Sequence, residues 1–206
     1  MRTNTRKLYG YHEDSGPFNV DGGRARYVVE AATDIIGRYT RQLLTVESVA
    51  GVQLELGDEQ QLNPRDLWLG GAKHELLITR RQIDAACIGI KPGVIVRGTY
   101  VPKLTQAGLS TKIVIADYDP GADKQAYAAI NNTVHEQAHS FGLAHCAVSE
   151  CVMFASINSE HAQAGNTPIT TDNPFCTNCV YNLDQGTKME GILDMAIAAV
   201  QHRNNS

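Results

Sequence analysis

The sequence predicts an α+β domain in which a mixed sheet is backed by helices. Two observations carry this prediction: apolar residues recur with helical spacing in three separate segments, and short β-branched runs lie between the first two of them. The chain has 206 residues, 43% of them hydrophobic, which suits one packed domain. We expect residues 1–206 to form a single domain, with an N-terminal subdomain of about 1–142 and a C-terminal subdomain of about 143–206.

The first half of the chain predicts one helix and four strands. Residues 1–22 are polar and contain several glycines, so we expect a loose lead-in or a short strand. A helix follows, because apolar residues recur at three- and four-residue steps from Val28 to Leu43. The strands are expected at residues 46–56, Glu75–Thr79, Val94–Thr99 and Lys112–Ala116.

The second half predicts a long helix, an irregular segment and a closing helix. Helical spacing runs through residues 124–141 and stops at Gly142, a residue suited to ending a helix. Residues 143–186 are rich in Cys, Asn, Pro and Thr and show little periodicity. A final amphipathic helix is expected at about residues 188–202.

Charge and composition argue against several classes of partner. The formal net charge is −4, so no basic surface for nucleic acid or an anionic membrane is expected. No apolar run approaches the roughly 20 residues of a membrane helix, and the first residues lead into no apolar signal segment. The number of cysteines is five, an odd count that argues against a disulfide framework. We therefore expect a cytoplasmic protein.

Three histidines surround the end of the long helix in a pattern typical of a zinc site. His135 and His139 are four residues apart, so on a helix they lie one turn apart on the same face. Gly142 can reverse the chain, so that His145 returns as a third ligand. Three nitrogens leave the fourth tetrahedral position for water, which is typical of catalytic zinc. Glu136 would lie beside the metal without binding it. The alternative is that these are ordinary helix histidines.

Four of the five cysteines form two close pairs separated by a loop, the arrangement of a closed zinc site. They are Cys146, Cys151, Cys176 and Cys179. Such a structural zinc would stabilise residues 147–175, which contain few apolar residues. It would also hold the backbone that presents His145, because Cys146 is the next residue. Free buried thiols and disulfides are the alternatives.

The other histidines and the fifth cysteine have no such neighbours in the sequence. We expect the histidines to be ordinary surface or core residues, and the cysteine to be a small core residue. They are His12, His74, His161, His202 and Cys87.

The segment from His135 to His145 reads His-Glu-x-x-His-x-x-Gly-x-x-His, the zinc-binding signature of the metzincin peptidases. With the cysteine extension that follows, the chain resembles the archaemetzincins. The resemblance is sharpest over residues 134–179, and the N-terminal third carries no matching motif. It implies a zincin-like or metzincin-like fold: a mixed twisted sheet with backing helices, an active-site helix, and a small irregular C-terminal subdomain that holds the Cys₄ zinc.

By this resemblance, the three histidines bind a catalytic zinc and Glu136 is the general base. Zinc would activate a water molecule, whose proton Glu136 would accept and pass to the leaving amine. Met153 would be the methionine of the Met-turn, an apolar thioether beneath the metal, which is compatible with ordinary core packing. A peptide substrate would lie along residues 94–99 at the sheet edge, with residues 112–116 as the interior neighbour.

This sequence departs from the family pattern in two places. The interval from Met153 to Cys176 is long, which predicts an insertion around Glu160–Thr171. Gln137-Ala138 stand where the family more often has an apolar residue and glycine. No tyrosine follows shortly after Met153, so a fifth, tyrosine ligand has no candidate.

Three functions are compatible with the sequence. The resemblance implies a zinc peptidase with two Zn²⁺ ions per chain, acting on a peptide or protein. A catalytically silent zinc scaffold is an alternative, although a scaffold needs no general base such as Glu136. A DNA-associated metalloprotease is another, which the acidic charge disfavours. Endopeptidase and aminopeptidase activities are both open, and zinc-activated water also hydrolyses other amides.

Overall fold

The computed structural model describes residues 5–14, 16–40, 42–56, 60–67, 69–91, 94–105, 108–117, 126–154 and 173–184. Among these residues, the main sheet has five strands in the order β2-β1-β4-β7-β6. Neighbouring strands run parallel, except that β6 is antiparallel to β7 and forms one edge. The strands are β1 (Thr5–Glu13), β2 (Leu43–Val52), β4 (His74–Thr79), β6 (Gly98–Thr105) and β7 (Gly108–Ala116).

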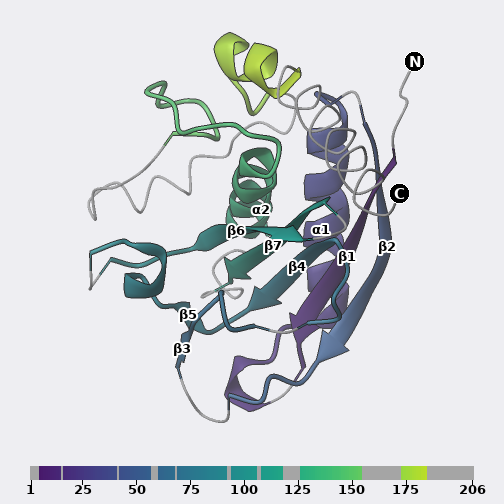
Figure 1. The fold of residues 1–206 in the computed structure, drawn as a ribbon, viewed down its shortest axis with the longest axis vertical. Coiled ribbons are helices and arrows are strands. Elements are labelled where there is room, and N and C mark those ends of the chain that lie inside the picture. Colours follow the sequence, from purple (N-terminus) through teal and green to yellow (C-terminus); the bar gives the residue numbers. More distant parts are fainter. Residues whose placement is uncertain are drawn as a thin grey trace, which may run out of the picture.

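Two helices, α1 (Gly22–Gly37) and α2 (Tyr127–His139), pack together on one face of the sheet (Figure 1). Side chains alternate between the two faces of a strand. Leu76 of β4 therefore joins the main core under the helices, whereas Leu77 joins a second core on the opposite face. Residues 60–97 supply much of that second core. They contain β3 (Gln61–Leu62), β5 (Gln82–Ile83) and the short helix η2 (Ala86–Ile88), and a further turn, η1 (Gly16–Phe18), precedes α1.

This architecture confirms a mixed, mostly parallel sheet backed by helices, and it shows where the N-terminal prediction was incomplete. Of the two expectations for the first residues, the strand is confirmed and the loose lead-in is not: residues 5–13 form a nine-residue strand in the sheet interior. This strand carries charged residues into the interior, and Glu13 is fully buried. The guanidinium of Arg81 donates to its carboxylate at 2.8 and 2.7 Å, and the Thr79 hydroxyl donates at 2.6 Å.

The first helix was predicted to reach Leu43, but α1 ends at Gly37. The apolar residues beyond it serve tertiary contacts rather than a continued helical face. The ring of Tyr39 lies edge-on to that of Phe175, with centroids 5.3 Å apart, and Leu43 begins β2. The following strand consequently spans Leu43–Val52 instead of residues 46–56.

The predicted strand at Val94–Thr99 is shifted, since β6 begins at Gly98. Its partner sets this limit: β7 ends at Ala116, whose N–H donates to the Arg97 carbonyl at 2.9 Å, so β7 has no residue left to pair with Val94. The order of the two strands is as predicted, with β6 at the edge and β7 inside it.

The long helix begins at Tyr127, because Ala126 has a left-handed φ of 57°. The helix ends as predicted: Gly142 has a φ of +86° and turns the chain. Residues 177–184 are helical, although an irregular segment was predicted there. Several predictions lie outside the described residues: the helix start at Lys124, the insertion at Glu160–Thr171, His161, His202 and the closing helix at 188–202.

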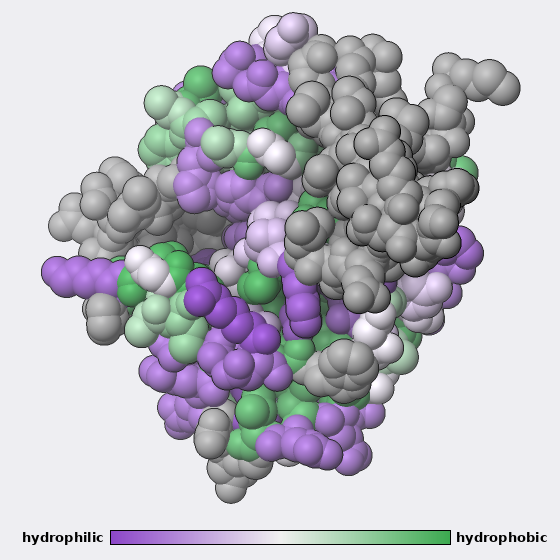
Figure 2. Space-filling view, in the orientation of Figure 1, coloured by the Kyte–Doolittle hydropathy of each residue, from purple (hydrophilic) through white to green (hydrophobic). Residues whose placement is uncertain are grey.

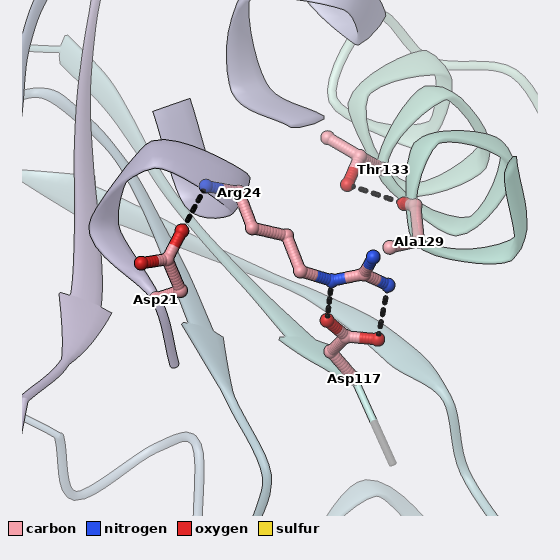
Figure 3. Close-up of polar contacts among 5 residues, drawn as sticks. All are labelled: Asp21, Arg24, Asp117, Ala129 and Thr133. Carbon is pink, nitrogen blue, oxygen red and sulfur yellow. Dashed lines mark hydrogen bonds and ion pairs between the residues drawn. The ribbon is translucent and has the colours of Figure 1, made fainter. Parts of the chain in front are cut away.

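A partly buried ion pair joins α1 to the end of β7. Figure 3 shows the guanidinium of Arg24 between α1 and α2, paired with Asp117 directly after β7. The two donated hydrogen bonds measure 2.6 and 3.1 Å. The same turn of α1 is capped by Asp21, whose carboxylate accepts from the Arg24 N–H at 2.8 Å. These contacts tie the start of α1 to the strand from which the chain leads to α2. No helix among the residues described above is long and apolar enough to cross a membrane.

Candidate metal centres

The structure brings the three predicted histidines together at the end of α2. His135 and His139 stand one turn apart on the helix, and the turn at Gly142 returns His145 to them. The three Nε2 atoms face one another at separations of 3.0, 3.2 and 3.2 Å. Ligands of a tetrahedral zinc with bonds of about 2.0–2.1 Å are separated by about 3.3 Å, so this arrangement fits zinc.

Main-chain carbonyls orient two of the three rings. His135 Nδ1 lies 2.7 Å from the carbonyl oxygen of Val152, and His139 Nδ1 lies 2.6 Å from that of Leu143. A carbonyl oxygen only accepts, so Nδ1 carries the proton in both rings and the Nε2 lone pairs are free. Lone pairs that converge at this range repel each other unless a cation lies between them. The donor set is therefore that of a cation site.

Burial keeps these imidazoles neutral, the form that binds metal. Desolvation lowers the pKa of His135 to about 4. It also lowers the pKa of His139 and of the more exposed His145. All three can thus serve as ligands at neutral pH without first losing a proton.

Glu136 follows the first histidine and is buried, with 8% of its surface exposed. Desolvation raises the pKa of its carboxyl to about 8, and a cation bound at the neighbouring imidazoles would lower it again. Gly98 of β6 lies against this carboxyl group. The next two residues of the helix, Gln137 and Ala138, are buried too. Figure 2, in the orientation of Figure 1, shows the surface hollowed beside α2 and above β6.

The four predicted cysteines also meet. Their Sγ atoms all lie within 4.8 Å of one another, and all are free thiols. Cys146 follows the last histidine, Cys151 lies in the next turn, and Cys176 and Cys179 begin the helix at 177–184. Four sulfurs from two chain segments are the donor set of a structural zinc site.

Thiol acidity differs within this cluster. Burial raises the pKa of Cys151 and of Cys179. The N–H of Cys179 at the start of the helix is the main cause that lowers the pKa of Cys176. The Cys176 N–H in turn points to the sulfur of Cys151 at 3.4 Å.

A short segment connects the two clusters. The carbonyl of Val152 accepts from His135, and the carbonyl of Met153 accepts from the Cys146 N–H at 3.0 Å. Met153 itself is fully buried in the main core, together with Cys151 and Cys179. The cysteine segment therefore packs on the same core as α1 and α2, which its polar composition did not indicate.

His12, His74 and Cys87, the other histidines and cysteine that the structure describes, take no part in either cluster. His74 is a core residue, which agrees with the expectation that the remaining histidines are surface or core residues. Its Nδ1 accepts from Arg6 at 3.2 Å and from Thr111 at 2.9 Å. His12 is half-buried. Cys87 was predicted in the core, but it is only half-buried and its thiol donates to Asp84 at 2.8 Å. This hydrogen bond to the Asp84 carboxylate holds the Cys87 side chain near the surface.

Residues on distant strands support the end of α2, and no motif in the sequence indicated them. Arg6 of β1 donates to the Ser140 hydroxyl at 3.1 Å, and its guanidinium lies 4.3 Å from the ring centroid of Phe141. Ser140 and Phe141 directly follow His139. Neither Arg6 nor Gly98 belongs to a motif, and only the tertiary structure shows these contacts.

Solved structures similar to this chain place its fold, although no family model and no curated protein sequence matches it. Archaemetzincin from Methanopyrus kandleri superposes with a TM-score of 0.60 at 19% identity, over 88% of this chain and 95% of that one. The fold is that of archaemetzincin. A zinc-dependent peptidase from Methanocorpusculum labreanum (strain Z) superposes with a TM-score of 0.50 at 15% identity, over 86% of this chain and 100% of that one.

Proposed function

We propose that this protein is a zinc-dependent peptidase with two Zn²⁺ ions. The observation that carries the proposal is the convergence of three imidazoles, with the buried Glu136 directly following the first of them on the helix. His135, His139 and His145 would hold the catalytic ion, and the four clustered cysteines would hold a structural one. The archaemetzincin fold supports this assignment.

When bound at the histidines, zinc supplies a Lewis acid that polarises the substrate carbonyl and lowers the pKa of a water molecule. Glu136 takes a proton from the attacking water on one carboxylate oxygen. It then delivers that proton to the amine nitrogen as the C–N bond breaks and the new C–O bond remains. Its burial keeps bulk water from competing for this proton.

The substrate in this proposal is a peptide or protein. β6 is an edge strand, and its first residue lies against Glu136. An extended peptide can add to such an edge by main-chain hydrogen bonds, which would carry its carbonyl past the carboxyl group. We further propose a cytoplasmic location, which the five free thiols support.

The test compares Glu136→Gln with the wild type on a peptide library, with zinc content measured in both. We expect the variant to keep both zinc ions and to lose activity by about 10²–10⁴-fold, the range for general acid–base catalysis. Glu150→Gln is the matched control, because Glu150 is exposed in the cysteine segment.

Two results would contradict the proposal. Activity retained by Glu136→Gln would remove the carboxylate from the reaction. A fully zinc-loaded wild type that cleaves no peptide would instead favour a silent scaffold. Repeating the assay with DNA tests the DNA-associated alternative, for which cleavage would depend on the added nucleic acid.

A further inference from the structure

Gly98 occupies the first position of β6, where it pairs with Ile115 of β7. A Cβ atom at this position would lie 2.8 Å from Glu136 Cγ, 2.9 Å from Oε1 and 3.2 Å from Cδ. Carbon atoms in contact are normally about 3.5–4.0 Å apart. The carboxyl arm of Glu136 therefore fills the space that any side chain at residue 98 would need.

The two backbones that meet here are both held in place. Glu136 lies inside α2, and its N-terminal neighbour His135 is held by the Val152 carbonyl at 2.7 Å. Next to Gly98, the Arg97 carbonyl accepts from the Ala116 N–H at 2.9 Å. A methyl group at residue 98 would consequently displace the carboxyl group rather than the strand or the helix.

The contact is specific to this glycine. Gly37, at the end of α1, has no atom within 4 Å of the corresponding Cβ position. Gly10 in β1 faces Val49 and Val29, which are packing residues. Among the glycines in the described part of the chain, Gly98 is the one whose missing side chain leaves room for the carboxyl group of Glu136.

We propose that Gly98 is a positioning residue for the reaction: its missing side chain sets where the Glu136 carboxylate stands. This inference rests on the proposed function, since it assigns the carboxylate a place in catalysis. A methyl group would move the side chain of Glu136 by at least about 0.7 Å to restore normal contact. Misplacement of a reacting group by about 1 Å can reduce a rate about 10²-fold.

The first experiment measures peptide hydrolysis by Gly98→Ala, with Gly37→Ala as the control. We expect kcat to fall about 10- to 100-fold while KM and the zinc content stay close to the wild-type values, because the substrate edge and the ligands are intact. Gly37→Ala should match the wild type in all three. A wild-type kcat in Gly98→Ala would overturn the proposal, even with Glu136→Gln inactive.

The second experiment needs no activity and uses the urea midpoint of unfolding. Gly98→Ala should lower the midpoint in the wild-type background, where the methyl group meets the carboxyl arm. In the Glu136→Ala background the arm is gone, so the same change should leave the midpoint unchanged or raise it, because alanine restricts the unfolded chain.

Equal midpoint losses in the two backgrounds would overturn the proposal, since the effect would then belong to the strand. This readout also separates the two proposals. If Glu136→Gln proves active, the proposed function fails, yet non-additive midpoints would still establish that Gly98 sets the position of the carboxyl group.

Discussion

The histidine and cysteine clusters are neighbours in sequence and are assembled in different ways. The three histidines lie within residues 135–145, on one helix and the turn that follows it, and main-chain carbonyls orient two rings. The four cysteines lie between residues 146 and 179, in two segments separated by residues 155–172. Local backbone geometry thus builds the first cluster, whereas the second depends on distant parts of the chain meeting.

This difference implies that support runs in one direction. Residues 145–146 and 152–153 join the clusters, and Val152 orients His135. Loss of a cysteine ligand should therefore disturb the histidine cluster through this segment. Loss of His139 should leave the cysteines in place, because its ring bonds the carbonyl of Leu143 and not the segment at residues 151–153.

The largest expected effect comes from Cys151→Ser. Because metal binding at such a site contributes directly to folding, the free energy of unfolding should fall by about 3 kcal/mol or more. Zinc occupancy at the histidines should fall as well. Zinc analysis and thermal unfolding check both results, with Cys87→Ser, outside the cluster, as the control.

The reverse substitution completes this test. His139→Ala should lose the histidine zinc and keep the cysteine zinc. An unchanged histidine site in Cys151→Ser, or loss of both ions from His139→Ala, would contradict the one-directional coupling.

The histidine cluster was predictable from the sequence because its geometry is local, and the cysteine cluster because its four residues form two close pairs. Residues four apart on a helix share a face, and a glycine that adopts positive φ lets His145 return. The helix at 177–184 was missed, since its apolar residues, such as Leu183, pack on a core made by distant strands.

The supporting residues could not be predicted, because their partners lie far along the chain. Arg6 donates to Ser140, which lies 134 positions later in the chain, and Gly98 of a strand contacts Glu136 of a helix. In the sequence, Arg6 is one of several charged residues in a polar N-terminal segment, and nothing distinguishes it from the others. The start of β6 could not be predicted for the same reason. It depends on where β7 ends, and the apolar alternation in Val94–Thr99 does not indicate that partner strand.

A smaller effect is expected from Arg6→Met, which removes the contacts between β1 and the end of α2. The guanidinium bonds Ser140 and His74 and lies over Phe141. Loss of these buried contacts should lower the free energy of unfolding by about 2–3 kcal/mol. Zinc affinity at the histidines should fall about 10-fold, because Ser140 and Phe141 follow His139.

Arg6→Met should leave the cysteine zinc unaffected, whereas Cys151→Ser should not. The control is Arg26→Met, whose exposed i,i+4 pair with Glu30 should be worth less than about 0.5 kcal/mol. Competition with a chelator, read at each site separately, measures the affinities. Equal weakening of both zinc ions would show that Arg6 supports the whole fold rather than the histidine cluster.

The smallest expected effect is a pH dependence at His74, a hydrogen-bond partner of Arg6. Burial, with the positive charges of Arg6 and Lys73, lowers the pKa of His74 from 6.5 to about 3. Its Nδ1 accepts two hydrogen bonds, so a proton there would remove an acceptor and face the guanidinium. Between pH 6.5 and 3 the unfolded chain therefore binds more protons at this residue than the folded protein does.

Stability from His74 is consequently complete above its unfolded pKa and is lost as the pH falls. From pH 7.5 to 5.5 this residue should lower the free energy of unfolding by about 1 kcal/mol. Asparagine supplies an acceptor near the Nδ1 position and does not titrate, so His74→Asn should show a shallower pH slope than the wild type. Urea unfolding of both proteins at equal zinc loading removes the contribution of the metal ligands from the difference. Identical slopes would mean that His74 keeps an ordinary pKa, and its contact with Arg6 would then be insensitive to pH in this range.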